Sequence, residues 1–207
     1  EPVLVAYGVG TDGKPVLLHV AAGGGESTDA WADFCADMVK RGLQSPLFVA
    51  SDGNQGLINA VETTWSRALR QRCLIHRSRN VIAKVPVEAQ DEVRLAFWEC
   101  FDKIDADAGQ DAVGEAKRRI GKFATRFKGR FPSAVDAMLA DTAALCSHLR
   151  LPREHWRRVR HTNLIERTFG ETRRRVTVIG RLPGENTCLT LVWAVLERAS
   201  AGWNGVA

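Results

Sequence analysis

An acidic residue follows a short apolar run in the first quarter of the chain. The run Pro46-Leu47-Phe48-Val49-Ala50 is typical of a strand covered on both faces, and Asp52 follows it in Ser51-Asp52-Gly53-Asn54-Gln55-Gly56. A carboxylate at a strand end, with a glycine beside it, can approach a divalent ion such as Mg²⁺, which prefers oxygen ligands. Asp52 with Gln55 three residues later also fits a capping box at a helix start. Both interpretations stay open at this point.

A second acid, Glu166, lies in a strongly basic segment. Asn163 as an N-cap with Glu166 three residues later would again form a capping box. Four arginines follow the acid, at Arg167, Arg173, Arg174 and Arg175. A carboxylate beside a positive helix suits a site that holds and attacks a phosphodiester, because arginine offers planar donors to phosphate and a metal ion neutralises charge on the leaving oxygen.

Cys73-Leu74-Ile75-His76 forms a C-x-x-H pair at the predicted end of a strand. Zinc would need three or four ligands. The spacing recruits no further ligand, since Cys35, His148, His155 and His161 are far away in the sequence. A cysteine–histidine nucleophile is conceivable, but no third orienting group is indicated. We expect a packed, hydrogen-bonded pair.

Residues 1–76 show alternating strands and helices that would position these groups. Two apolar runs, 3–9 and 16–21, flank Thr11-Asp12-Gly13-Lys14, and an Asp-Gly turn predicts a hairpin. Helical periodicity extends from Ser27 to Arg41, and Gly42 follows as a stop. A strand over 46–50, a helix from about Gln55 to Ser66 and a strand over 69–75 complete the pattern. Ligand sites in open α/β sheets lie at the carboxyl ends of strands, where Asp52 is expected.

Residues 77–158 contain no convincing strand and predict an all-helical insertion. Helical periodicity covers 91–104, 107–127 and 133–149, separated by glycine and proline. The expected core of this bundle comprises Trp98, Phe101, Ile120, Phe123, Met138 and Leu145. Residues 159–207 return to a helix carrying Glu166, a turn over 180–184 and an apolar helix over 187–200.

The positive charge of the chain is segregated. The 207 residues carry a formal charge of +5, but residues 67–84, 117–130 and 150–181 carry +6, +7 and +7. Such clusters favour a nucleic-acid partner through counterion release, although each cluster alone could be a solvated helical face. No apolar run is long enough to span a membrane, and five scattered cysteines are unlike a secreted disulfide framework. We expect a cytoplasmic protein that does not interact with a membrane.

The chain resembles the Mutator-type transposases of bacterial insertion sequences. The resemblance is carried by Ser51-Asp52-Gly53, Arg72-Cys73-x-x-His76-x-x-Arg79-Asn80, His161-Thr162-Asn163-x-x-Glu166-Arg167 and Glu171-x-Arg173-Arg174-Arg175-x-Thr177-x-x-Gly180-x-x-Pro183. It implies a ribonuclease-H-like α/β fold with a mixed sheet and a helical insertion. It also implies a DDE site in which two aspartates and a glutamate hold two Mg²⁺ (or Mn²⁺) ions.

In this resemblance, Asp52 corresponds to the second aspartate and Glu166 to the glutamate, both as catalytic metal ligands. Cys73 and His76 match the C-x-x-H signature, to which we assign a site-positioning role. The implied substrates are transposon ends and target DNA, with Arg167 and Arg173–Arg175 as DNA contacts, and the implied assembly is a homodimer or higher oligomer.

One departure from the family pattern bears on activity. The first aspartate of the family lies on a central strand before the opening hairpin, and Asp12 is no replacement because it sits in the hairpin turn. We therefore expect a fragment that is inactive by itself, without that strand or the N-terminal DNA-binding region. Two alternatives stay open: a different ribonuclease-H-like nuclease, and a non-catalytic DNA-binding protein derived from a transposase.

Overall fold

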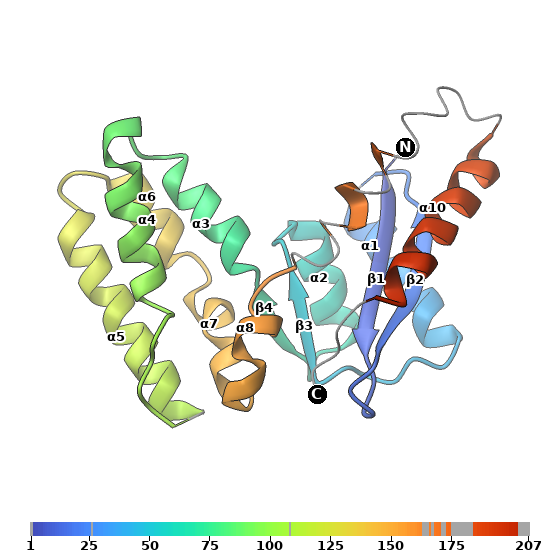
Figure 1. Ribbon diagram of the computed structural model, residues 1–207, viewed down its shortest axis with the longest axis horizontal. Coiled ribbons are helices and arrows are strands. Elements are labelled where there is room, and N and C mark those ends of the chain that lie inside the picture. The colour runs from blue at the N-terminus through green and yellow to red at the C-terminus, as the bar shows by residue number, and fades with distance from the viewer. Residues whose placement is uncertain are drawn as a thin grey trace. The chain divides into compact units, whose positions relative to one another are not determined.

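The computed structural model describes residues 2–25, 27–107, 109–162, 166, 168–170, 173–174 and 184–202 (Figure 1). The chain divides into two compact units. The first unit comprises Glu1–Pro46, Asn54–Ala68 and Thr162–Ala207, and the second comprises Leu47–Gly53 and Leu69–His161. Strands and helices alternate in the order expected of an α/β protein.

The first unit opens with the predicted hairpin. Strands β1 (Val3–Val9) and β2 (Pro15–Ala22) pair antiparallel. At the turn, Asp12 Oδ1 accepts a hydrogen bond from the Lys14 backbone N–H at 3.1 Å, and Gly13 has a φ of +76°. The Asp-Gly signal is explained by this geometry, since glycine adopts a positive φ without steric cost.

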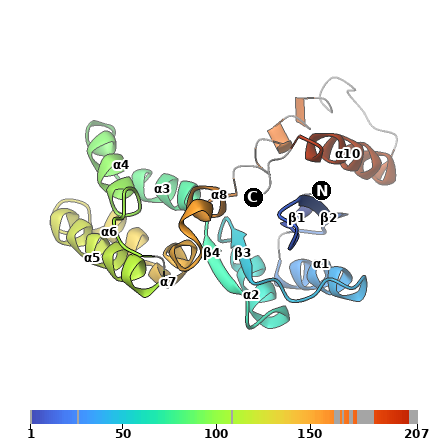
Figure 2. The same ribbon diagram turned by 60° about the horizontal axis from the view of Figure 1, so that its bottom comes forward.

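Helices α1 (Thr28–Lys40), α2 (Gln55–Thr64) and α10 (Glu185–Ser200) accompany the hairpin in the first unit. Helix α1 is capped by Ser27, whose hydroxyl accepts from the Ala30 N–H, and it buries Phe34, Cys35 and Met38. Helix α2 packs against α1, and α10 packs against β2 (Figure 2). These elements confirm the predicted helices to within two residues at each end.

The second unit contains a parallel strand pair. Strands β3 (Phe48–Ser51) and β4 (Leu69–Arg72) pair in parallel, with Ser51 opposite Arg72, and the chain joins them through α2. The predicted end of β4 at Ile75 is wrong, because helix α3 (Leu74–Ile82) begins there. Its first residue, Leu74, is fully buried and its backbone N–H donates to the Arg160 carbonyl at 2.9 Å.

A helical bundle fills the rest of the second unit (Figure 2). After α3 its elements are η1 (Val87–Ala89), α4 (Gln90–Glu99), α5 (Gln110–Phe127), α6 (Pro132–Leu139), α7 (Thr142–Leu145), η2 (Ser147–Arg150), η3 (Arg153–His155) and α8 (Trp156–Val159). Five of the six expected core residues are buried, and the sixth, Trp98, is partly buried against the same core. The continuous helix predicted over 133–149 is instead broken at Asp141, which has a φ of +59°.

Side chains of β4 connect the helical bundle to the parallel strand pair. Arg70 Nη1 lies 2.5 Å from Asp141 Oδ2. Gln71, which is fully buried, donates to the Leu145 carbonyl at 3.2 Å and accepts from the His148 backbone N–H at 2.7 Å. Residues 70 and 71 therefore both contact the segment that follows the break at Asp141.

None of the helices described is long and apolar enough to cross a membrane.

Candidate functional site

Asp52 lies directly beyond the carboxyl end of β3 and is solvent-exposed. The next residue, Gly53, has a φ of +89°, and α2 begins at Gln55. The N-cap of α2 is Asn54, whose side-chain oxygen accepts from the Leu57 N–H at 3.1 Å. The capping-box interpretation of Asp52 and Gln55 is therefore wrong, because Asn54 and not Asp52 caps this helix.

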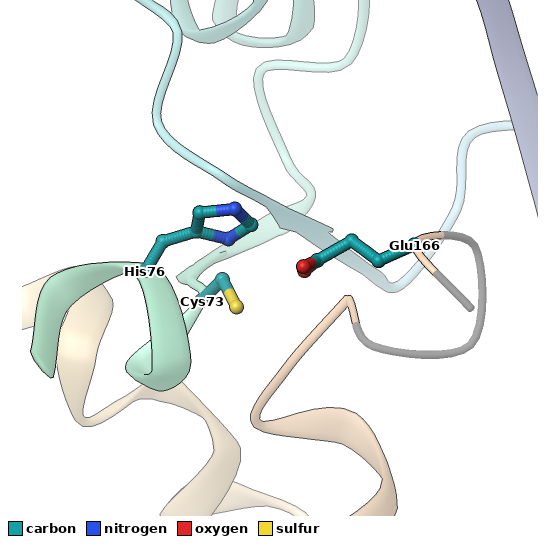
Figure 3. Close-up of side chains that lie close together, drawn as sticks. All are labelled: Cys73, His76 and Glu166. Carbon is teal, nitrogen blue, oxygen red and sulfur yellow. The ribbon is translucent and has the colours of Figure 1, made fainter. Parts of the chain in front are cut away.

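Cys73 lies at the same edge, beyond the end of β4. Its backbone N–H donates to the Ser51 carbonyl at 2.8 Å, which continues the β3–β4 ladder by one bond. The side chain of Cys73 is fully buried, and His76 lies in the first turn of α3 (Figure 3). The C-x-x-H pair thus occupies a strand-to-helix junction, and the strands bring it to the edge that carries Asp52.

The structure accounts for two of the residues considered as zinc ligands by their packing. Cys35 is buried in α1, and burial raises the pKa of its thiol to about 11. His148 is fully buried with Nδ1 3.2 Å from Gln71 Oε1, and burial lowers its pKa to about 3. Both residues behave as neutral interior groups, as the non-metal interpretation expects.

Glu166 belongs to the first unit, whereas Asp52, Cys73 and His76 belong to the second. Within its own unit, the half-buried Glu166 accepts a hydrogen bond at Oε1 from the Thr162 hydroxyl at 3.2 Å. Its backbone N–H donates to the Thr162 carbonyl at 3.4 Å. Figure 3 labels Glu166 together with Cys73 and His76. The pairing of Asp52 with Glu166 in one site stays a prediction.

The expected DNA contacts are described in part. Arg173 and Arg174 are helical and exposed, as a phosphate contact requires. Arg167 and Arg175 lie outside the described residues, and so does Asn163, the proposed N-cap before Glu166.

Sequence reasoning gave no role to Arg72, which the structure places against Gly53. A Cβ atom added to Gly53 would lie 0.5 Å from Arg72 Nη1, so the guanidinium fills the space beside the glycine. The signal was present in the sequence, since Arg72 directly precedes Cys73. The contact between Arg72 and Gly53 follows only from the register of β3 with β4, which places Arg72 opposite Ser51.

Comparisons with known proteins agree with the motifs. The sequence profile described as "Transposase, Mutator family" matches residues 1–205. The chain is 32% identical to the transposase for insertion sequence element IS6120 of Mycolicibacterium smegmatis, over 99% of the chain and 61% of that protein. It is 30% identical to the transposase for IST2 of Acidithiobacillus ferrooxidans, over 99% and 67%, and 32% identical to the transposase for ISRM5 of Rhizobium meliloti (strain 1021), over 98% and 49%.

The chain thus spans about half to two thirds of the length of these relatives. The match extends over nearly all of its own residues and includes every motif around Asp52, Cys73, His76 and Glu166. The chain belongs to the Mutator family of transposases.

Proposed function

We propose that the chain forms the catalytic part of an insertion-sequence DNA transposase, which cuts transposon ends and joins them to target DNA. The observation that carries the proposal is the position of Asp52, an exposed acid that is not the N-cap of α2 and stands at the carboxyl edge shared by β3 and β4. Ligand sites of open α/β sheets lie at this edge.

The donor chemistry at this edge fits Mg²⁺ or Mn²⁺. Asp52 offers an exposed carboxylate, and hard divalent ions select oxygen ligands. Asp52 and Glu166 would hold the ions, which would activate a water or 3′-hydroxyl and would stabilise the departing oxygen. The residues of the chain align the DNA, with Arg167, Arg173, Arg174 and Arg175 contacting phosphates and Cys73 and His76 positioning the edge.

The fold assignment belongs to the same proposal. A hairpin, a parallel pair joined through a helix and a helical segment before Glu166 are consistent with a ribonuclease-H-like fold. We propose core segments at 1–76 and 159–207 with a helical insertion at 77–158. A homodimer or higher oligomer is the proposed assembly.

The test is a strand-transfer assay on the full-length protein with Mg²⁺ and labelled transposon-end DNA. Asp52→Asn and Glu166→Gln should each reduce joining at least roughly 100-fold while DNA binding persists, because each change removes a negatively charged ligand. Asp12→Asn, an acid in the hairpin turn, is the matched control and should keep full activity.

Three outcomes would contradict parts of the proposal. Full activity of either variant removes that acid from the site. Cleavage by the wild type without joined products points to a nuclease. DNA binding by the wild type with neither cleavage nor joining points to a non-catalytic DNA-binding protein.

A further inference from the structure

Arg72 is held next to the turn that carries Asp52 by the backbone of the parallel pair. Its Cα lies opposite that of Ser51, and the following N–H, from Cys73, donates to the Ser51 carbonyl at 2.8 Å. The Gln71 side-chain amide donates to the Arg72 carbonyl at 2.7 Å. The backbone of Arg72 is therefore held beside Ser51, the residue before Asp52, by hydrogen bonds on either side of it.

The guanidinium of Arg72 lies directly against the Cα of Gly53. A Cβ built on Gly53 would lie 0.5 Å from Nη1 and 1.7 Å from Cζ of Arg72, distances that no side chain could occupy. Gly53 also has a φ of +89°, which L-residues rarely adopt. Both observations favour glycine at this position, and the first does so because Arg72 is there.

The electrostatics connect Arg72 to Asp52 as well. Arg72 is only 7% exposed, and burial lowers the pKa of its guanidinium. The negative charge of Asp52 is the strongest influence in the opposite direction, ahead of that of Asp141. Arginine stays charged in proteins, so this interior cation needs a nearby anion. Among the described residues, its buried Nε has no hydrogen-bond partner.

We propose that Arg72 is a positioning residue for Asp52, with its guanidinium packed over Gly53 to hold the Asp52–Gly53 turn and its charge orienting the Asp52 carboxylate. The proposal rests on the proposed function, in which Asp52 is a metal ligand. The same positive charge opposes a metal ion at that carboxylate. Arg72 therefore lowers the metal affinity of the site to some extent while it fixes the position of the Asp52 carboxylate.

The first test is a double-mutant cycle of thermal unfolding in metal-free buffer with Asp52→Asn, Arg72→Gln and the double variant. Asp52→Asn should lower the midpoint by about 2 °C when Arg72 is present, because the buried cation loses the strongest negative charge that acts on it, and should change it little in the Arg72→Gln background. Arg77 supplies the matched control. It is equally buried, but its guanidinium donates to the Ala137 carbonyl at 2.6 Å. Asp52→Asn should lower the midpoint as much in the Arg77→Gln background as in the wild type.

The second test measures joining by the full-length protein as a function of Mn²⁺ concentration. Arg72→Gln should lower the maximal rate roughly tenfold or more, because a misplaced ligand is costly to catalysis. It should also lower the Mn²⁺ concentration for half-maximal rate at least roughly twofold, because a repelling charge is gone. Arg72→Lys should restore the wild-type metal dependence and, lacking the flat guanidinium, only part of the rate.

These outcomes separate the two proposals. Additive unfolding midpoints overturn the role of Arg72, and so does a rate loss in Arg72→Gln without any change in metal dependence, since loss of structure alone gives that pattern. If instead Asp52→Asn keeps full activity, the proposed function fails, while the cycle in metal-free buffer still reports the coupling between Arg72 and Asp52.

Discussion

Arginines are used differently at the β4–α3 junction and on helix α5. At the junction, Arg72 and Arg77 are less than 10% exposed, and their guanidinium groups lie against backbone. On α5, Arg118 and Arg126 are more than half exposed and pair with Glu115 at 2.6 Å and Glu92 at 2.9 Å. The junction arginines are part of the interior, whereas those of α5 are neutralised at the surface.

The difference shows what a charge count along the sequence misses. Residues 117–130 contain seven basic side chains and no acid, yet four of the seven are ion-paired: Arg118, Arg119, Arg126 and Arg130. Their acids come from just before the run and from α4. The run therefore offers a phosphate backbone less positive charge than its sequence indicates.

The largest effect is expected when a glycine of each region, Gly53 or Gly114, is replaced by alanine and the two variants are compared. Gly53→Ala must displace the Arg72 guanidinium and place alanine at a φ of +89°, which costs about 1–3 kcal/mol of stability. Misplacement of Asp52 should reduce strand joining roughly 100-fold. Gly114→Ala on α5 is the control, because a Cβ there meets open space. It should gain about 0.5–1 kcal/mol and keep activity. Equal behaviour of the two variants in thermal unfolding and joining assays would contradict the tight contact at Gly53.

The ion pairs of the two regions should differ next. Arg70 and Asp141 are 16% and 29% exposed at their side chains and join β4 to the residue that breaks α6 from α7. Arg70→Ala leaves Asp141 without this partner in a partly buried place, and should cost about 1–3 kcal/mol of stability. Arg126→Ala, in a more exposed pair, is the comparison variant and should lower the unfolding midpoint much less. If both midpoints fall equally, burial does not distinguish these pairs.

The sequence predicted those elements whose signals are local. The Asp12-Gly13 turn, the helical periodicity from Ser27 to Arg41 and the apolar run before Asp52 each depend on neighbouring residues, and the structure confirms the elements around them. The strand end also placed Asp52 at a sheet edge. Local chemistry sufficed because the turn and the cap are closed by hydrogen bonds across two or three residues.

The features that could not be predicted from the sequence depend on contacts with residues far away in the chain. Leu74-Ile75 has the composition of a strand, but Leu74 begins a helix whose first N–H is bound by Arg160. The break at Asp141 contains neither glycine nor proline, and its charge partner, Arg70, lies 71 residues away. The role of Arg72 likewise depends on the β3–β4 register. In each case the deciding contact is absent from the local pattern.

A buried titratable group, His148, contacts Gln71 of β4. Burial lowers its pKa to about 3. An unfolded histidine binds a proton near pH 6.5, so between these values the unfolded chain holds more protons than the folded one. Stability should be complete above pH 6.5 and fall as the pH drops towards 3, by at most about 1.4 kcal/mol per unit. Urea unfolding from pH 7 to 4.5 measures this slope.

His148→Asn should flatten that slope, whatever its effect on stability at pH 7. His19, whose pKa is also lowered by burial, remains in both proteins and accounts for a residual slope. The depressed pKa values of Glu92 and Glu115, which accept hydrogen bonds from arginines, lose their contribution only at lower pH. An unchanged slope in His148→Asn would show that His148 does not stay neutral in the folded protein.

The smallest effect is expected where arginines in and just after α5 are already paired. Arg126→Gln with Arg130→Gln removes two cations that both contact Glu92, at 2.9 and 3.1 Å, so the Glu92 carboxylate is released when they are replaced. The two arginines and Glu92 together carry a net charge of +1, so their replacement should reduce the slope of log affinity against log salt by at most about 0.9. Arg173→Gln with Arg174→Gln should reduce the slope by about 0.9 for each phosphate that the protein no longer neutralises. Fluorescence anisotropy over a salt series measures both slopes. A reduction larger than about 0.9 from replacing Arg126 and Arg130 would mean that DNA displaces Glu92 from both arginines, and the surface around them would then replace residues 173–174 as the proposed phosphate-binding face.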